Sequence, residues 1–517
     1  MNGTRLHAAS DEASDRAFDG GSDGIHPTRL RAGGLIAMIL VAGWVPAVSL
    51  AGASPRASDS GSQPSVDWTP CADAPGVQCG SLKVPLDWSS PKGREIHVAV
   101  ARRPADDRDR RVGTLFFNPG GPGDGAVRYV VGAEHIFSTT LLARFDIVGM
   151  DPRGMVGSTP ITCAKPVLTP ELTLFPKTRH QFRQLRRHNR EVAQSCLKAT
   201  GPLIEHVDTV SVARDHEALR QALGAARVSW LGLSYGTQVA ANYAELYPEQ
   251  TRAMVLDAAL EHSLTEVQQV AGEAMAAEDS FNRFVRWCET AVTCALQGRN
   301  VAALYDRLVA RAGHHPIPVD GALRPVTGED IRMATVGLLL FKSPTIYGPD
   351  SSWSGLSRAI RSALGGDAVA FAQPPAEVAQ DDIENLVGIG CNDYVAQVHN
   401  YGEMRQRIQL GRQIAPHLQG ATEIWRANLC IDWPLPAANP PRRLHVEGVP
   451  TLIVHAVHDP SVAYTWAHSL ATQIQGSDLL TRTGDGHTSY YTSACARLAT
   501  DRYLVRPQAP ADRICRG

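Results

Sequence analysis

The residues best suited to do chemistry in this chain are a serine between two glycines, a distant aspartate and a distant histidine. Residues 232–236 read Gly-Leu-Ser-Tyr-Gly, with an apolar run before them and a helical pattern after them. This setting is typical of a tight turn that projects a serine hydroxyl from the end of a sheet. The helix N-terminus behind the serine also favours developing negative charge. We interpret Ser234 as a catalytic nucleophile rather than a structural serine in a glycine turn.

A nucleophilic serine needs a general base and a carboxylate that orients the base. Asp459 follows the apolar residues 449–455, where the acid belongs if that run is a strand. His487 comes 28 residues later, in a glycine-rich loop before a helical stretch. The chain order of serine, acid and histidine is the one that a nucleophile elbow predicts. We therefore predict a triad of Ser234, Asp459 and His487.

Two neighbours are alternatives for these roles. His458 could serve as the base, but it would point the other way along the chain from Asp459. Asp485 could serve as the acid, but a loop neighbour two residues away rarely reaches the histidine in line. Three further carboxylates are interpreted as structural: Asp151, Asp257 and Asp432.

Two backbone amides should form an oxyanion hole for the tetrahedral intermediate. The first is that of Tyr235, the residue after the nucleophile. The second should come from the loop at residues 118–123, Asn-Pro-Gly-Gly-Pro-Gly, because glycines let the backbone approach a substrate closely. We prefer Gly121 as this donor, with Gly120 next. A plain Pro/Gly turn is the alternative for this loop.

The elements that must position these residues alternate between strands and helices. Near-continuous apolar strands separated by helices indicate a parallel sheet covered on both faces, an α/β fold. Strands are predicted at residues 114–117, 145–150, 228–231, 254–257 and 449–455, and helices at 210–223, 237–247, 465–474 and 490–498.

A long helical stretch interrupts this alternation. Between residues 261 and 440 strands are lost, which favours an inserted helical cap, with helices predicted at 264–277, 279–287, 301–312 and 353–364. We assign residues 66–260 to the first part of the core, 261–440 to the cap and 441–517 to the C-terminal part of the core.

The N-terminal region has the features of an export signal. Arg29 and Arg31 precede an apolar run at residues 35–50, which ends at Ala-Gly-Ala, a small-residue cleavage pattern. We predict a signal peptide or N-terminal anchor over residues 1–53, then a Ser/Pro/Gly-rich linker over 54–65. The protein should be secreted or held at the cell envelope. Any membrane contact should come from this N-terminal segment alone.

Ten cysteines all follow the proposed cleavage site, and an even number in an exported chain favours disulfides over metal ligation. Spacing alone does not fix the pairing. We expect neighbours to pair: Cys71–Cys79, Cys163–Cys196, Cys288–Cys294, Cys391–Cys430 and Cys495–Cys515. The sequence has no cluster typical of a zinc site, so we expect no metal and no other cofactor.

Composition argues against some partners. Hydrophobic residues make up 44% and charged residues 20% of the chain, and the formal net charge is −2. These values are ordinary for a globular protein, and nothing in them points to a polyanionic partner such as a nucleic acid. We expect a monomer that acts on a peptide or ester substrate.

Taken together, the motifs make the chain similar to a known group across nearly all of residues 70–517. It resembles the exported tripeptidyl aminopeptidase-like α/β-hydrolases, which are related to prolyl (proline) aminopeptidases and also labelled carboxylesterase A. Besides the elbow and the glycine-rich loop, the resemblance rests on Val-Pro-Leu-Asp-Trp at 84–88, Asp-Pro-Arg-Gly at 151–154, Cys-Asn-Asp at 391–393, Cys-Ile-Asp-Trp-Pro at 430–434 and Gly-His at 486–487.

The resemblance implies an α/β-hydrolase fold with a large helical cap and triad roles for Ser234, Asp459 and His487. The chain departs from the group in two places. Asp124-Gly125-Ala126 follows the glycine-rich loop where Gly-Ser-Gly is common, which puts a negative charge beside the oxyanion loop. Ser461-Val462 follows the acid where Thr-Pro is common in the group. This difference should affect the neighbouring pocket but leave the catalytic chemistry intact.

Three hypotheses for function follow. The first is a serine peptidase that cleaves short peptides from free N-termini through an acyl-enzyme, with cap carboxylates that bind the substrate ammonium group. Asp393 is our candidate for that contact. The second is a carboxylesterase or lipase-like enzyme that uses the same triad on esters. The third is a binding module without catalysis, which the filled triad positions disfavour.

Overall fold

The computed structural model describes residues 64–517, except 73, 156 and 373–375. The predicted signal segment at 1–53 and most of the linker at 54–65 therefore lie outside the described residues. None of the helices within the described ranges is both long enough and apolar enough to cross a membrane.

The core of the fold is one ten-stranded sheet with the strand order β1-β2-β3-β5-β4-β6-β7-β8-β9-β10. The strands β3 and β5 pair antiparallel, as do β1–β2 and β2–β3, whereas every pair from β5 through β10 is parallel. The strands are β1 (Thr69–Pro70), β2 (Gln78–Pro85), β3 (Glu95–Arg103), β4 (Gly113–Asn118), β5 (Phe145–Met150), β6 (Val228–Leu233), β7 (Thr251–Asp257), β8 (Thr451–His458), β9 (Asp478–Asp485) and β10 (Ile514–Cys515).

The parallel strands are apolar on both faces because helices cover both. In β4, Leu115 and Phe117 belong to one buried cluster and Phe116 to another, as expected when successive side chains point to opposite faces. The first cluster contains side chains of α1 (Val127–Val131), α2 (Ala133–Ile136), α3 (Thr139–Arg144) and α16 (Ala494–Val505). The second contains side chains of α5 (Thr209–Ala222), α6 (Tyr235–Leu246) and α14 (Tyr464–Ala471). The predicted α/β-hydrolase fold is confirmed.

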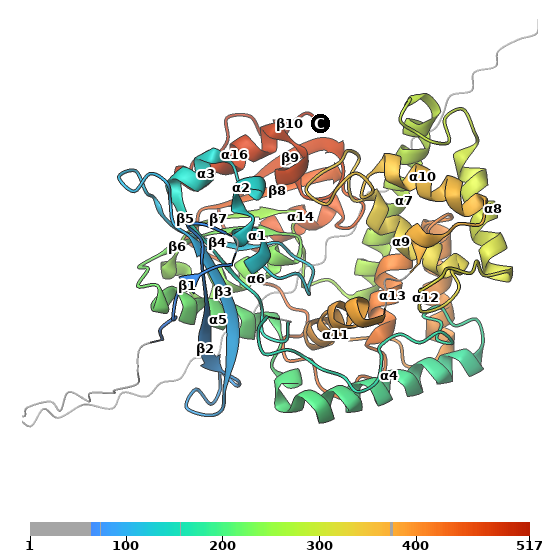
Figure 1. Cartoon of the computed structure of the whole chain (residues 1–517), viewed down its shortest axis with the longest axis horizontal. Coiled ribbons are helices and arrows are strands. Elements are labelled where there is room, and N and C mark those ends of the chain that lie inside the picture. Colours follow the sequence, from blue (N-terminus) through green and yellow to red (C-terminus); the bar gives the residue numbers. More distant parts are fainter. Residues whose placement is uncertain (1–63, 73, 156, 373–375) are drawn as a thin grey trace, which may run out of the picture. The chain divides into compact units, whose positions relative to one another are not determined.

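The helices between β7 and β8 form a cap: the first four share a hydrophobic cluster of their own, whereas buried side chains of the last three belong mainly to one of the two core clusters. They are α7 (Glu266–Thr290), α8 (Val301–His314), α9 (Gly328–Leu339), α10 (Trp353–Leu364), α11 (Ala376–Asp393), α12 (Tyr401–Ile414) and α13 (Ala421–Leu429), and they group together in Figure 1. Two predicted helices, at 264–277 and 279–287, are wrong as separate elements. They form the single helix α7, because no helix breaker separates them and Ala274, Ala277, Phe281 and Phe284 continue one buried face.

A helix that precedes the predicted cap packs against it. Helix α4 (Arg179–Thr200) places Asn189 so that its amide donates to the carbonyls of Asn428 and Ile431 at 2.8 and 2.9 Å. Asp432 accepts from Arg186 and Arg190 of the same helix. The helical layer therefore includes a segment that the sequence pattern assigned to the core. The last predicted helix, at 490–498, is two elements, α15 (Ser489–Thr492) and α16.

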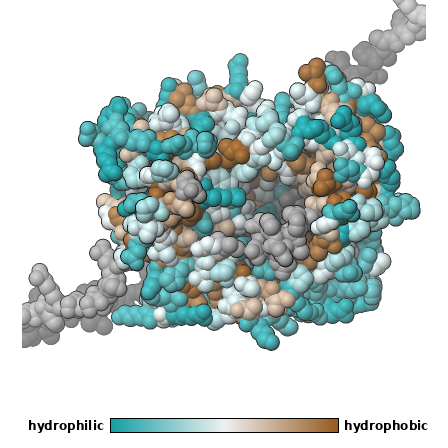
Figure 2. Space-filling model, in the orientation of Figure 1, coloured by the Kyte–Doolittle hydropathy of each residue, from teal (hydrophilic) through white to brown (hydrophobic). Residues whose placement is uncertain are grey.

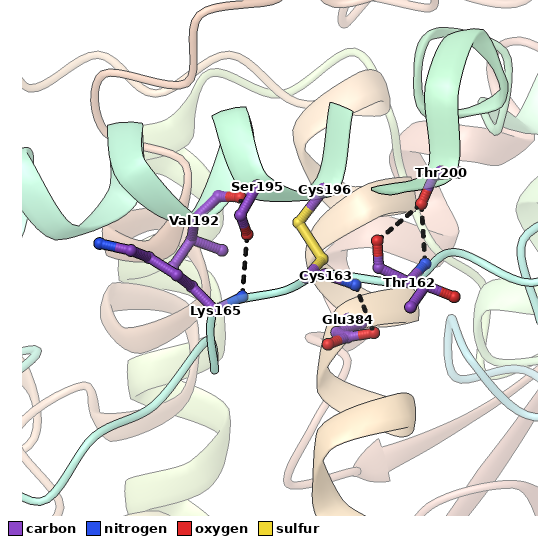
Figure 3. The surroundings of a disulfide bond; sticks show 8 residues. All are labelled: Thr162, Cys163, Lys165, Val192, Ser195, Cys196, Thr200 and Glu384. Atoms are coloured by element: carbon purple, nitrogen blue, oxygen red, sulfur yellow. Dashed lines mark hydrogen bonds between the residues drawn. A yellow bond between two sulfur atoms is a disulfide. The ribbon is translucent and has the colours of Figure 1, made fainter. Parts of the chain in front are cut away.

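All five predicted disulfide pairings are confirmed. Figure 3 shows the Cys163–Cys196 bridge, which ties the segment after β5 to the end of α4. Around it the Thr162 amide donates to the Thr200 hydroxyl at 2.8 Å, and the Cys163 amide donates to Glu384 of α11 at 3.3 Å. On the face seen in Figure 2, apolar residues are scattered among polar ones.

Candidate active site

Ser234 occupies a strained turn between β6 and α6. Its φ is +54°, in the left-handed region that non-glycine residues rarely adopt. A Cβ at position 232 would lie 2.4 Å from the Gly236 carbonyl oxygen, and one at position 236 would lie 2.3 Å from the Asn118 oxygen. Both flanking positions therefore require glycine. The geometry of the turn matches the nucleophile elbow predicted from the sequence.

The glycine-rich loop after β4 lies directly against this turn. A Cβ at Gly120 would be 2.8 Å from the Leu233 oxygen and 2.9 Å from the Ser234 Cβ. The Gly120 amide donates to the Asn118 side chain at 3.1 Å, so it is already engaged. Gly121 lines the same cavity as Ser234. These contacts favour Gly121 over Gly120 as the loop's oxyanion donor, beside the Tyr235 amide at the start of α6.

His487 and Asp459 form a buried pair. The imidazole Nδ1 lies 2.8 Å from Asp459 Oδ2 and 3.0 Å from Oδ1. The Asp459 side chain is fully buried, and its Oδ1 also accepts the amides of Ser461 and Val462 at 2.8 and 3.0 Å. Burial alone would raise the pKa of Asp459, but the charge and hydrogen bond of His487 lower it. Asp459 is therefore held as a carboxylate.

The same pair shifts the pKa of His487 upward. Burial opposes protonation of the imidazole, but the charge of Asp459, its hydrogen bond and the nearby charge of Asp257 outweigh that effect. The imidazole is thus a stronger base than a free histidine. With Nδ1 bonded to Asp459, Nε2 is the nitrogen left for a substrate or nucleophile.

Ser234 and His487 line one cavity of about 320 Å³ between the core and the cap. Core residues supply its catalytic groups, and cap residues supply a mostly apolar wall. The lining is Pro119, Gly121, Asp124, Ser234, Ser461, His487 and Thr488 from the core, with Gly337, Leu340, Phe341, Tyr347 and Ser351 from the cap. The cavity thus gathers a hydroxyl, an imidazole and a donor loop at the carboxyl ends of parallel strands, where α/β sheets bind ligands.

The two alternatives for the base and acid are engaged elsewhere. His458 Nδ1 lies 2.7 Å from Asp279 of α7, away from Asp459. Asp485 binds Lys342 and Arg283, both from the cap. Neither contacts the His487–Asp459 pair through these bonds, so the geometry favours Asp459 over Asp485 as the acid.

Asp257, interpreted as structural, supports the histidine loop. It ends β7, is fully buried, and accepts the amides of Ser489 and Tyr490 at 2.9 and 2.6 Å. Burial raises the pKa of Asp257 to about 6. From the other side Arg482 donates to the carbonyl of Asp485 at 2.9 Å.

The predicted substrate contact of Asp393 needs correction. Its side chain is fully buried, and its oxygens accept from the Thr209 amide at 3.0 Å and from Asn439 at 2.9 Å. Burial, with the nearby charge of Asp208, raises its pKa to about 7. Asp393 fastens α11 to α5 and to the segment before β8. It does not line the cavity that holds Ser234, so it cannot meet a substrate there.

Sequence reasoning missed the cap residues of the cavity. Leu340, Phe341 and Tyr347 lie in a stretch without strand or helix periodicity, so no pattern singled them out. Asp124 was noted only as a departure from a family motif. It lines the cavity, where Arg128 pairs with it at 2.6 Å and the Tyr129 hydroxyl donates to it at 2.7 Å.

Comparisons with known proteins agree with this geometry. The family model described as alpha/beta hydrolase fold matches residues 113–349, and that described as TAP-like protein matches residues 416–515. Carboxylesterase B of Mycobacterium tuberculosis is 30% identical over 519 residues, 92% of this chain and 96% of the relative. Serine protease Hip1 of the same species is 29% identical, with 86% and 89% covered. Tripeptidyl aminopeptidase of Streptomyces lividans is 28% identical, with 89% and 87% covered.

Proposed function

We propose that this chain, which belongs to the α/β-hydrolase family and is a serine hydrolase, is an exported peptidase. In this proposal it removes short peptides from the free N-termini of its substrates. The observation that carries the proposal is the single cavity that contains Ser234 and His487, with Asp459 bonded behind the histidine. Relatives named serine protease and tripeptidyl aminopeptidase, together with the TAP-like match, support peptide substrates.

The proposed mechanism is acyl transfer in two steps. His487 Nε2 removes the hydroxyl proton of Ser234 as its Oγ attacks the scissile carbonyl carbon. The amides of Tyr235 and Gly121 donate to the carbonyl oxygen as it becomes an oxyanion. The imidazolium then gives its proton to the leaving amine, and the acyl ester on Ser234 remains. Water, deprotonated by His487, hydrolyses that ester and restores the serine.

Export is supported by the disulfides. Five pairs among the described residues favour an oxidising compartment such as the cell envelope or the medium. The signal segment itself lies outside the described residues, so sequencing the N-terminus of the mature protein is the direct test of its removal.

A carboxylesterase is the second candidate. It is favoured by the relative named carboxylesterase B and by the apolar cavity wall of Leu340, Phe341 and Tyr347, which suits an acyl chain. The same triad cleaves both bonds, so the difference lies in the cap.

The two candidates are separated by paired substrates. We expect a tripeptide p-nitroanilide with a free N-terminus to be hydrolysed with a kcat/KM at least about tenfold higher than its N-acetylated form. Equal rates on the two forms, with faster turnover of p-nitrophenyl esters, would favour the esterase. Ser234→Ala should abolish both activities.

A further inference from the structure

The loop that carries His487 is bound to the cap as well as to the core. The His487 amide donates to the Leu340 carbonyl, just after α9, at 2.7 Å. Two residues earlier, Asp485 pairs with Lys342 at 2.7 Å and with Arg283 of α7. Between them, a Cβ at Gly486 would lie 2.8 Å from the Leu340 oxygen, so only glycine allows this close approach.

The core and the cap bind different parts of this loop. Arg482 donates to the carbonyls of Asp485 and Gly486 at 2.9 and 2.5 Å. Both side-chain oxygens of Asp485, in contrast, are engaged by the cap cations. That side chain is 5% exposed, so burial would raise its pKa, yet the hydrogen bonds from Arg283 and Lys342 lower it. Asp485 therefore stays charged and depends on the cap for its partners.

We propose that Asp485 is a positioning residue through which the cap holds the imidazole of His487 in place. The proposal rests on the proposed function of Ser234 and His487. Strand β9 ends at Asp485, so Gly486 alone separates the charged anchor from the histidine. A shift of the Asp485 side chain is therefore transmitted to His487 over this one residue.

The same cap segment also shapes the substrate cavity. Leu340 and Phe341 line the cavity, while Lys342, the next residue, binds Asp485. The position of residues 340–342 therefore determines both the shape of the cavity wall and the placement of His487. His487 is correctly placed only while residues 340–342 rest on the loop, which couples the position of the cap to the reaction.

Asp485→Asn tests this coupling because it keeps the size of the side chain and removes its charge. We expect kcat to fall about ten- to a hundredfold with KM changed less than about threefold, since small misplacements of reacting groups cost about this much. The rate of Ser234 labelling by a fluorophosphonate should fall in parallel.

The matched control is Asp432→Asn. Asp432 also pairs with two arginines, Arg186 and Arg190 of α4, but it lies in the segment after α13, outside the nucleophile's cavity. Its φ is +62°, a conformation that asparagine tolerates. We expect a loss of stability with kcat within about twofold of wild type. A kcat for Asp485→Asn that is unchanged, or lowered no more than in Asp432→Asn, would overturn the proposal.

Variants on the cap side keep the test decisive if Asp485→Asn does not fold. Lys342→Met keeps a long apolar side chain but removes the ammonium group, which binds Asp485 and lies 5.2 Å from the centre of the Trp353 ring, and it should lower kcat about three- to tenfold. Lys342→Arg should restore it. Equal activity in Lys342→Met and wild type would contradict the proposal. Failure of wild-type protein to react with the fluorophosphonate would instead contradict the proposed function.

Discussion

Asp459 Oδ2 lies 2.8 Å from Nδ1 of His487, and its Oδ1 is held by the amides of Ser461 and Val462. The backbone of its own loop therefore holds the carboxylate in place independently of its hydrogen bond to the imidazole. With the proton of the neutral ring on Nδ1, Nε2 is left as the acceptor on the cavity side. The relationship defines which nitrogen can take the Ser234 proton.

Asp459→Asn should therefore inactivate the enzyme without unfolding it. An asparagine amide in this place donates to Nδ1 and selects the tautomer whose Nε2 carries the proton. We expect kcat to fall about 10⁴-fold, the loss typical of this change in a serine triad. Steady-state kinetics with thermal melting checks this. A fall in kcat of less than tenfold in a folded variant would show that a residue other than Asp459 orients His487.

The pH dependence should follow the raised pKa of His487. The neutral imidazole is the base, and a raised pKa keeps the ring protonated to a higher pH than in a free histidine. Activity should therefore be lost as the pH falls through a pKa above the ordinary value of about 6.5. A pH profile of kcat/KM measures it. If activity were lost only at a pH well below that value, the charge of Asp459 would not be raising the pKa of His487.

Gly120→Ala should disable the oxyanion loop. The added Cβ would meet the Leu233 oxygen at 2.8 Å and Ser234 itself at 2.9 Å, so the loop must move off the turn. We expect kcat to fall about 10²- to 10³-fold, as when one oxyanion donor is lost.

The control for this change is Gly224→Ala. Gly224 follows α5 and also has a positive φ, +62°, but its Cβ would meet no atom of the described residues within 4 Å. Melting temperatures should fall in both variants from backbone strain, while kcat should fall only in Gly120→Ala. Comparable kcat values in the two variants would show that this loop takes no part in catalysis.

The sequence predicted the parts of the site that local patterns encode. The Gly-x-Ser-x-Gly turn, the glycine-rich loop and the carboxyl ends of apolar strands leave strong signals, because each demands particular residues at fixed spacing. Residues such as Ser234, Asp459 and His487 were therefore assigned from their context. The five disulfides also followed the expected neighbouring pairs.

The cap was less predictable because its contacts are long-range. Nothing in the local sequence shows that Lys342 meets Asp485 or that Tyr347 enters the cavity, since both lie in an aperiodic stretch. Asp393 was assigned to the substrate because it is a carboxylate in the predicted cap, where the substrate ammonium group was expected to bind. Its complete burial against Thr209 and Asn439 depends on how α11 packs, which local patterns do not encode.

Ser234 should form the covalent intermediate of the reaction. Wild-type protein treated with a fluorophosphonate and digested should carry the label on the peptide that contains residue 234, identified by mass spectrometry. Ser234→Ala should fold, take no label and lose hydrolysis. Labelling of a different residue, or hydrolysis that survives in Ser234→Ala, would show that Ser234 is not the nucleophile.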